Sequence, residues 1–519
     1  MSKVYSDNLN LQQRMLKGVN TLADNVAVTL GPKGRNVILS KKGSMPIITK
    51  DGVTVASFVD LEDPVENAAA QILKQVAKET NSSAGDGTTT STVLAREIIR
   101  NSQKYLIAGS SPVELKRGMD QTIKVITNKI SEMSRPVESI EDIENIATIS
   151  ANNDSTIGKL IASAVDKVGH NGSVLIEPAK SMETSLDLVE GFRFNSGYFA
   201  QAFVNNERKN SIEYEDALIL VTDYKIDDVK KILPVLELSA RESRPLIVVA
   251  EHVEGQALAA LIMNTVRGSM KVAAVKAPEY GNERTNAMKD LCVSTGAFFF
   301  SRTSGKSLDE ATLSDFGLCK KVEITKNSTI IMGGSADHEQ VEKRIQSLKS
   351  EIKQTEDMNE CRRIQARITR LSAGVAVIKV GGVTEVEMLE RKHRIEDAME
   401  AVRAAQEEGV VPGGGTTLLR CADFSLELDD EDQRIGAEIV RKSLLAPIRQ
   451  MAINSGESPD LVVDRVITSG LGWDFKNSVL IDLLDAGIID PAKVTRVALE
   501  NSISVASTLI TTNNAIIEE

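Results

Sequence analysis

Apolar residues recur at helical spacing near both ends of the chain. The clearest run lies before residue 80 and consists of Val65, Ala68, Ala69, Ile72, Leu73, Val76 and Ala77. Steps of three and four positions place such side chains on one face of an amphipathic helix. The pattern therefore predicts a mostly helical region over residues 1–132 and a second helical region at the end of the chain.

The central part alternates short apolar runs with helical patterns. The runs that predict strands are 173–178, 217–221, 245–249, 270–275, 297–300 and 375–380. Helices are expected over 155–168 and 384–407, and 335–371 reads as a charged helical pair. Buried strands that alternate with helices are typical of an α/β domain.

A small-residue loop, Asn81-Ser-Ser-Ala-Gly-Asp-Gly-Thr-Thr-Thr90, separates two helical patterns. Gly85 and Gly87 allow backbone N–H groups to turn inward, and the next helix begins with its partial positive charge there. This combination can bind phosphate, with Asp86 available for Mg²⁺. A turn that only caps a helix is the alternative interpretation. The chain contains no Walker A motif.

Two further glycine turns favour the phosphate interpretation. One is 28–37, which contains Gly31-Pro32, and the other is 409–416. Between them, 47–56 predicts strand-like runs on either side of an Asp-Gly turn. Together with Asp51, Asp86 and Asp490, these turns predict a nucleotide pocket assembled from both halves of the sequence.

Composition narrows the function classes. The chain has 519 residues, so several domains are expected, and its formal net charge of −12 argues against nucleic acid as a partner. No apolar run approaches a membrane span, and the first residues lack a secretory signal, so a cytoplasmic protein is expected. The cysteines show no Cys-x-x-Cys spacing and the histidines are isolated, which predicts free thiols and no zinc site.

The motifs resemble those of the group I chaperonins, the GroEL family. The resemblance spans about residues 20–512 and rests on 29–36, 85–90, 271–278 and 409–415 in that order. It implies a multidomain α and α/β chaperonin fold. The expected domains are a helical equatorial domain (1–132 and 408–519), a small α/β intermediate domain (133–189 and 376–407) and an α/β apical domain (190–375). Hinges would lie at Gly191 and Gly374, with Ala373 where most members have a second glycine.

The same resemblance implies an ATPase that uses Mg²⁺ and K⁺. Asp397 would orient the attacking water with help from Asp51, although the helical pattern alone makes Asp397 part of a solvated charged face. Asp86 would bind Mg²⁺, and K⁺ would lie near Thr89 and the carbonyls of Thr29 and Lys50. The implied nucleotide contacts are Thr29, Leu30, Gly31, Pro32, Lys50, Gly87, Thr88, Thr89, Thr90, Gly414 and Asp490.

The sequence departs from the family at the nucleoside end. A short Asn-Ala-Ala stretch is usual against adenine, whereas Gly472-Trp-Asp-Phe-Lys476 stands in its place here. Phe475 either stacks on the base or belongs to a repacked loop. ATP binding with altered affinity is expected.

Client proteins would bind an apolar groove between two apical helices. The corresponding positions are Tyr198, Phe203, Leu233, Leu236, Leu258, Ile262 and Met263. Helical spacing alone fits a buried core equally well. An aromatic residue of the family's groove is Ala202 here, so preferences for clients or for a GroES-like co-chaperonin would differ.

The resemblance also implies heptameric rings that capture non-native proteins and release them into a chamber. Arg449 is present at the usual contact between rings, but Ser458 replaces the acidic partner. The sequence is therefore compatible with either a single or a double ring. Two other functions are open as well. One is a passive holdase or assembly scaffold with a weakened ATPase, and the other, which is disfavoured, is a small-molecule kinase or phosphatase.

Overall fold

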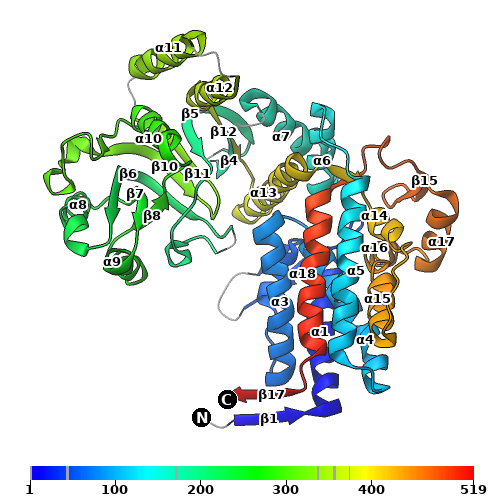
Figure 1. Ribbon diagram of the computed structural model, residues 1–519. Helices are drawn as coiled ribbons and strands as arrows, with labels where there is room; N and C mark the ends of the chain where they lie inside the picture. The colour runs from blue at the N-terminus through cyan, green and yellow to red at the C-terminus, as the bar shows by residue number, and fades with distance from the viewer. Residues whose placement is uncertain are drawn as a thin grey trace. The chain divides into compact units, whose positions relative to one another are not determined.

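The structure is a computed structural model that describes residues 3–41, 46–169, 173–179, 181–207, 209–335, 338–354, 358–372 and 374–518 (Figure 1). Its chain forms two compact units. The first comprises Met1–Ser163, Pro178–Thr184 and Val380–Glu519, and the second comprises Ala164–Glu177 and Ser185–Lys379. The predicted equatorial ranges lie within the first unit, and the whole of the predicted apical range lies within the second. The predicted intermediate ranges are divided between them, and the three-domain division stays a prediction.

The first unit is mainly helical. Its helices are α1 (Asn8–Ala27), α2 (Gly52–Phe58), α3 (Pro64–Ala84), α4 (Thr88–Ile107), α5 (Pro112–Met133), α6 (Ile140–Ser150), α13 (Glu385–Glu408), α14 (Thr416–Cys421), α15 (Glu431–Ser443), α16 (Ala446–Ser455), α17 (Pro459–Ser469) and α18 (Ala492–Ile510). Helix α7 (Ser155–Val168) begins in this unit and ends in the second.

Helix α18 joins the two ends of the chain in one core. It packs against α3, α4 and α5, which lie beside it in Figure 1. Leu499, Ile503 and Leu509 of α18 share a buried cluster with Leu73 of α3 and Leu94 of α4. Small and aliphatic side chains fill this cluster, as expected for a chain with 3% aromatic residues.

Four two-stranded ribbons complete the first unit. They are β1 (Lys3–Asp7) with β17 (Asn514–Glu518), β2 (Val37–Leu39) with β3 (Ile47–Thr49), β13 (Val410–Pro412) with β16 (Ile489–Pro491), and β14 (Gly472–Asp474) with β15 (Val479–Ile481). All four ribbons are antiparallel.

The second unit is built on a nine-stranded mixed sheet with the order β4-β12-β5-β11-β10-β6-β7-β8, and β9 pairs with β6. Its strands are β4 (Ser173–Pro178), β5 (Ser185–Phe194), β6 (Ile212–Ile226), β7 (Leu246–Val253), β8 (Val272–Lys276), β9 (Phe299–Phe300), β10 (Gly317–Ile324), β11 (Thr329–Gly334) and β12 (Gly374–Val380). Its helices are α8 (Val229–Glu242), α9 (Gly255–Val266), α10 (Gly281–Thr295), α11 (His338–Gln354) and α12 (Met358–Ser372). Short 3₁₀ turns are η1 (Gln201–Phe203), η2 (Leu308–Glu310) and η3 (Leu313–Asp315).

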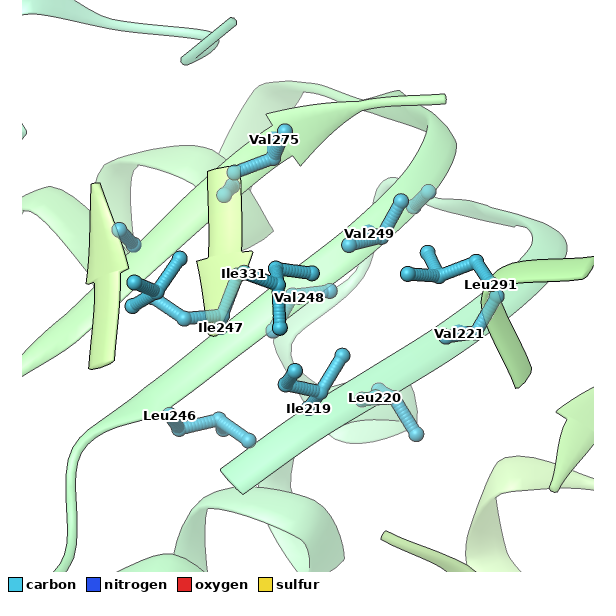
Figure 2. Close-up of a cluster of buried hydrophobic side chains, with 14 of the residues drawn as sticks. Ile219, Leu220, Val221, Leu246, Ile247, Val248, Val249, Val275, Leu291 and Ile331 are labelled. Carbon is cyan, nitrogen blue, oxygen red and sulfur yellow. The ribbon is translucent and has the colours of Figure 1, made fainter. Parts of the chain in front are cut away.

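The parallel part of this sheet forms the centre of the second core. Strands β6, β7 and β8 run parallel, and their apolar runs are buried on both faces. Figure 2 shows Ile219, Val248 and Val275 from these three strands packed together with Leu291 of α10. This burial explains why the runs are continuously apolar rather than alternating.

Most predicted elements are confirmed, and one is wrong. Residues 173–178 form β4 and 155–168 form α7, as predicted. The segment after Asp51 was expected to be strand-like, but Gly52–Phe58 is helix α2. The Asp51 carboxylate accepts hydrogen bonds from the backbone N–H groups of Val53 and Thr54, and this cap outweighs the β preference of the two valines.

The two glycines predicted as hinges lie in paired strands. Gly191 lies within β5, and Gly374 begins β12 opposite Glu190. A Cβ on Gly191 would lie 2.7 Å from the Ile331 carbonyl oxygen, so close strand packing already requires glycine there. Ala373 lies outside the described residues, and the hinge role stays a prediction. Among the helices of the described residues, none has the length and apolar character needed to cross a membrane.

Candidate functional site

A cavity of about 280 Å³ lies within the first unit. Its walls come from segments far apart in sequence. They include the turn 29–32, the segment 49–52, the loop 85–90, one face of α13, the turn 412–415 and the hairpin residues 473–476. Every nucleotide-contact residue predicted from the sequence lines this cavity, and so do Asp51, Asp86 and Asp397.

The loop between α3 and α4 exposes backbone at one wall. Gly85 and Gly87 both have left-handed backbone conformations, with φ of 72° and 84°. Gly87 is the N-cap of α4, so Thr88, Thr89 and Thr90 form its first turn at the cavity. The unpaired N–H groups of a first helical turn attract anions. The geometry is therefore suited to phosphate.

Three carboxylates contribute to the electrostatics of the cavity. Burial raises the pKa of Asp86, and the charge of Asp51 raises it further. The Ser150 hydroxyl partly opposes these effects because it donates a 2.9 Å hydrogen bond to Asp86 Oδ2. Burial and the charge of Asp86 raise the pKa of Asp490 to about 7. A cation at this wall would relieve the repulsion among the three acids.

Lys50 lines the cavity near Arg394 of α13 and is held at two points. Its Nζ donates to the Gly31 carbonyl at 3.2 Å and to Asn152 Oδ1 at 2.9 Å. Burial lowers the pKa of Lys50 to about 8, and the nearby Arg394 guanidinium adds to this shift. Lys50 thus connects the turn after α1 with the end of α6.

Helix α13 presents one ionisable stripe to the cavity. Glu390, His393, Arg394 and Asp397 line it at spacings of three and four residues. Arg394 donates hydrogen bonds to Glu390 from Nε and Nη2, and its Nη1 lies 3.5 Å from Asp154 Oδ2, which fixes its guanidinium. The structure therefore brings Asp397 into the same cavity as Asp51 and the loop 85–90.

The turn after α1 offers oxygen atoms to the cavity. The Thr29 and Thr89 hydroxyl oxygens are 3.3 Å apart. Within the described part of the chain, the backbone carbonyls of Thr29 and Lys50 accept no hydrogen bond. Carbonyl and hydroxyl oxygens are ligands of hard cations.

The wall predicted to contact the nucleoside carries two large aromatic residues. Trp473 and Phe475 are 5% and 3% exposed, and they belong to an apolar cluster with Met451 and Ile448 while they also line the cavity. A Cβ built on Gly414 would lie 4.0 Å from Phe475 Cε2. Phe475 is thus part of both this apolar cluster and the cavity wall.

The predicted client positions differ in exposure. Tyr198, Phe203 and Leu236 are buried in the core of the second unit. Leu233 on α8 and Met263 on α9 are 46% and 51% exposed, and Leu258 and Ile262 are partly buried. Val266 on α9, which was not predicted, is 66% exposed.

Sequence reasoning missed several contributors to the cavity. Ser150 and Asn152 contact Asp86 and Lys50, and their signal was the pair Asn152-Asn153 after an apolar helix pattern. Both asparagines have positive φ, which asparagine tolerates better than most residues. Glu390 and Arg394 lie on the same α13 face as Asp397, so the helical period would have included them.

Comparisons with known proteins agree with this architecture. The chain is similar to the chaperonin gp146 from the bacteriophage EL 2 (Pseudomonas aeruginosa), crystallised in the presence of ATP-BeFx. For crystal form II the identity is 20%, the TM-score is 0.68 and 99% of each chain is covered. For crystal form I the identity is 19% and the TM-score is 0.63, again over 99% of each chain.

These features define the chaperonin fold, with a helical unit that contains the cavity and an α/β unit inserted into its sequence. The model of the TCP-1/cpn60 chaperonin family matches residues 22–519, and the chain belongs to this family. The resemblance to chaperonins of the GroEL type is thereby confirmed, and the protein has a chaperone role in protein folding.

Proposed function

We propose that the protein is an ATP-dependent chaperonin that hydrolyses ATP in the cavity of its first unit. The single observation that carries the proposal is the meeting of Asp397 on α13 with Asp51 and the phosphate-binding geometry of 85–90 in one cavity. The family is generally an ATPase, and the similar phage chaperonin was crystallised with ATP-BeFx.

Phosphate would be bound by the first turn of α4 and by the backbone of Gly87. Mg²⁺ commonly takes one or two protein carboxylates and completes its shell with phosphate oxygens and water. Asp86 fits this role, because its burial beside two other acids favours a cation. The described residues contain no group of three or more His, Cys, Asp or Glu that could hold a metal alone, so the metal would bind together with the nucleotide.

Asp397 and Asp51 would orient the attacking water for transfer of the γ-phosphoryl group. This reaction depends mainly on positioning and charge stabilisation, so a carboxylate on a rigid helix is a suitable group. Arg394 is fixed by Glu390 and Asp154, and Lys50 by Gly31 and Asn152, so these cations would add positive charge without moving. K⁺ would be held by Thr89 and by the carbonyls of Thr29 and Lys50.

Asp490 and Gly414 would contact the sugar and base, with Phe475 beside them. The aromatic residues Trp473 and Phe475 at this wall support an affinity for ATP that differs from that of relatives with the usual Asn-Ala-Ala stretch. Purine stacking against an edge of Phe475 would replace that contact.

Non-native clients would bind an apolar surface of α8 and α9. Its exposed members are Leu233, Met263 and Val266, and exposed apolar patches commonly mark interaction sites. The flexible Met263 side chain suits a surface that accepts many sequences. ATP can release clients only through a difference in its affinity for two conformations.

A heptameric ring, single or double, and a GroES-like co-chaperonin complete the proposal. Ile38, Ile47 and Ile48 of the β2–β3 ribbon are between 44% and 68% exposed, which supports burial by a second copy. Position 458, where relatives carry the acidic partner of the arginine, is a serine here, and Arg449 pairs instead with Asp460 of its own chain. This supports a contact between rings that is either weaker than in relatives or made by other residues.

The experiment is to measure ATP turnover and client refolding of wild type and of Asp397→Asn. The variant is expected to bind ATP but to lose about 100-fold or more in turnover, because only the water-orienting carboxylate is removed. Equal turnover in both proteins would overturn the assignment of Asp397. Client capture without turnover in wild type would instead favour a passive holdase.

A further inference from the structure

A directional chain of hydrogen bonds runs from α4 through α16 to the turn after α1. Arg96 on α4 pairs with Asp24 at 2.7 Å and donates to Gln450 Oε1 at 3.1 Å. Gln450 Nε2 donates to Asn454 Oδ1 at 3.0 Å. Asn454 Nδ2 donates to the carbonyls of Ala27 and Leu30, both at 2.9 Å.

This series of hydrogen bonds permits only one orientation of the Gln450 and Asn454 side-chain amides. A guanidinium can only donate, so it fixes the oxygen of Gln450 toward Arg96 and the amide nitrogen toward Asn454. The Asn454 oxygen must then accept, and both of its N–H groups point to the turn. Gln450 is 9% exposed, so water competes little for these bonds.

The two carbonyls held by Asn454 lie on either side of Thr29. The neighbouring Val26 and Val28 carbonyls accept from Thr29 and Arg35. Among the carbonyls of residues 26–31, that of Thr29 is the one that accepts no hydrogen bond within the part of the chain that the structure describes. Met451, one turn before Asn454, packs against Gly31, where a Cβ would lie 2.8 Å from Met451 Cγ.

We infer that Asn454, oriented by Gln450 and Arg96, is a positioning residue for the nucleotide site. It fixes the turn so that the Thr29 carbonyl is left for a cation and the backbone of 30–32 keeps its place in the cavity wall. This inference rests on the proposed function. Because Arg96 lies on α4, whose first turn lines the cavity, these hydrogen bonds also connect two walls of the cavity.

Two variants test this role by changing polarity with little change in shape. Asn454→Asp replaces both donors by an acceptor that faces two carbonyls. Gln450→Glu keeps an acceptor for Arg96 but has no donor for Asn454. Asn101→Asp is the matched control, because Asn101 is also on α4 and donates to Ser443 at 3.2 Å but does not line the cavity.

The first readout is the fluorescence of Trp473, the sole tryptophan and a cavity residue, during titration with MgATP at several KCl concentrations. Both test variants are expected to raise the ATP Kd and the half-saturating K⁺ concentration about tenfold, as loss of one or two buried hydrogen bonds implies. The second readout needs no ligand. Amide hydrogen exchange of 28–35 should be faster in both variants and unchanged in the control.

The outcomes separate failure of the proposed ATP binding from failure of the proposed role of Asn454. Wild-type protein that binds no ATP would overturn the proposed function. Wild-type binding together with unchanged Kd, K⁺ dependence and exchange in Asn454→Asp and Gln450→Glu would overturn the role of Asn454 alone. A global loss of protection in Asn454→Asp leaves Gln450→Glu, in which the amide side chain of Asn454 is retained, as the deciding variant.

Discussion

Arg367 donates two hydrogen bonds to the buried carboxylate of Asp290, from Nε at 2.7 Å and from Nη2 at 2.9 Å. Asp290 lies on α10 with 3% of its side chain exposed, and Arg344 on α11 donates a third bond at 2.9 Å. One acid therefore holds both members of the charged helical pair α11 and α12 in the second unit.

Asp290→Asn should release this helical pair. Two partly buried guanidinium groups would lose their counter-charge, and breaking a fully buried pair on one side costs roughly 3–5 kcal/mol, which is the upper bound here. Limited proteolysis should then cut α11 and α12 several-fold faster. Lys343→Ala is the control, because its ion pair with Glu339 is about 70% exposed on both sides and exposed pairs contribute little. Equal cleavage of the two variants would contradict the prediction.

Asp490→Asn should change how stability depends on pH. The pKa of Asp490 is raised to about 7 in the folded protein, so the folded state holds a proton that the unfolded state has released above about pH 4. Wild type therefore loses stability as pH rises from about 4 to about 7, by up to a few kcal/mol. The variant should lack this loss and be the more stable protein at pH 8 without nucleotide.

Chemical denaturation at pH 5 and pH 8, followed by Trp473 fluorescence, measures the difference. Asp485→Asn provides the comparison, since Asp485 is an exposed acid in the same segment. Parallel pH curves for Asp490→Asn and wild type would show that Asp490 is ionised in the folded protein throughout this range.

Gly85→Ala should destabilise the first unit and weaken ATP binding. Gly85 has a φ of 72°, and an added Cβ would lie 2.2 Å from Cβ of Glu400 on α13. Gly470→Ala separates the two causes, since its φ is 69° but nothing lies within 4 Å of its Cβ position. We expect a cost of about 1 kcal/mol for Gly470→Ala and about 2–4 kcal/mol for Gly85→Ala by thermal unfolding.

Thiol labelling should distinguish Cys361 from the other three cysteines. Burial raises the pKa of Cys319 to about 12 and of Cys421 to about 11, and it also raises the pKa of Cys292. Cys361 is partly exposed. At pH 8, an aromatic disulfide reagent should modify Cys361 at least about 100-fold faster than the others, because the thiolate is the reactive form. The fast phase should vanish in Cys361→Ser.

The sequence predicted elements well where one periodicity dominated. The 3.6-residue period identified α3 and α7, and the continuous apolar runs identified β7 and β8. The error at 52–58 arose because Val53 and Val55 favour a strand, whereas the Asp51 cap and its position beside α3 favour a helix. Such competition between local preference and packing is decided by neighbours that the sequence does not identify.

The sequence predicted the acidic residues and glycine turns that line the cavity, but it did not predict the polar side chains that hold these segments in place. Asp51 and Asp86 stood out because they lie in glycine-containing turns, whereas Asp397 was identified only through the family resemblance. Asn152, Gln450 and Asn454 did not stand out, since an amide side chain in a helix or turn is ordinary until its partners are known. Buried Leu236 illustrates the opposite limit, because helical spacing does not distinguish an exposed groove from a core.

The first unit is assembled from both ends of the chain, and this has a consequence for the synthesis of the protein itself. Residues 185–379 contain nearly all of the second unit, so its sheet can close while the chain is still being made. The faces of α3, α4 and α5 that α18 covers stay uncovered until α18, which ends at Ile510, has been synthesised. During that interval the unfinished chain displays uncovered apolar helices, and it is a non-native protein of the kind that chaperones bind.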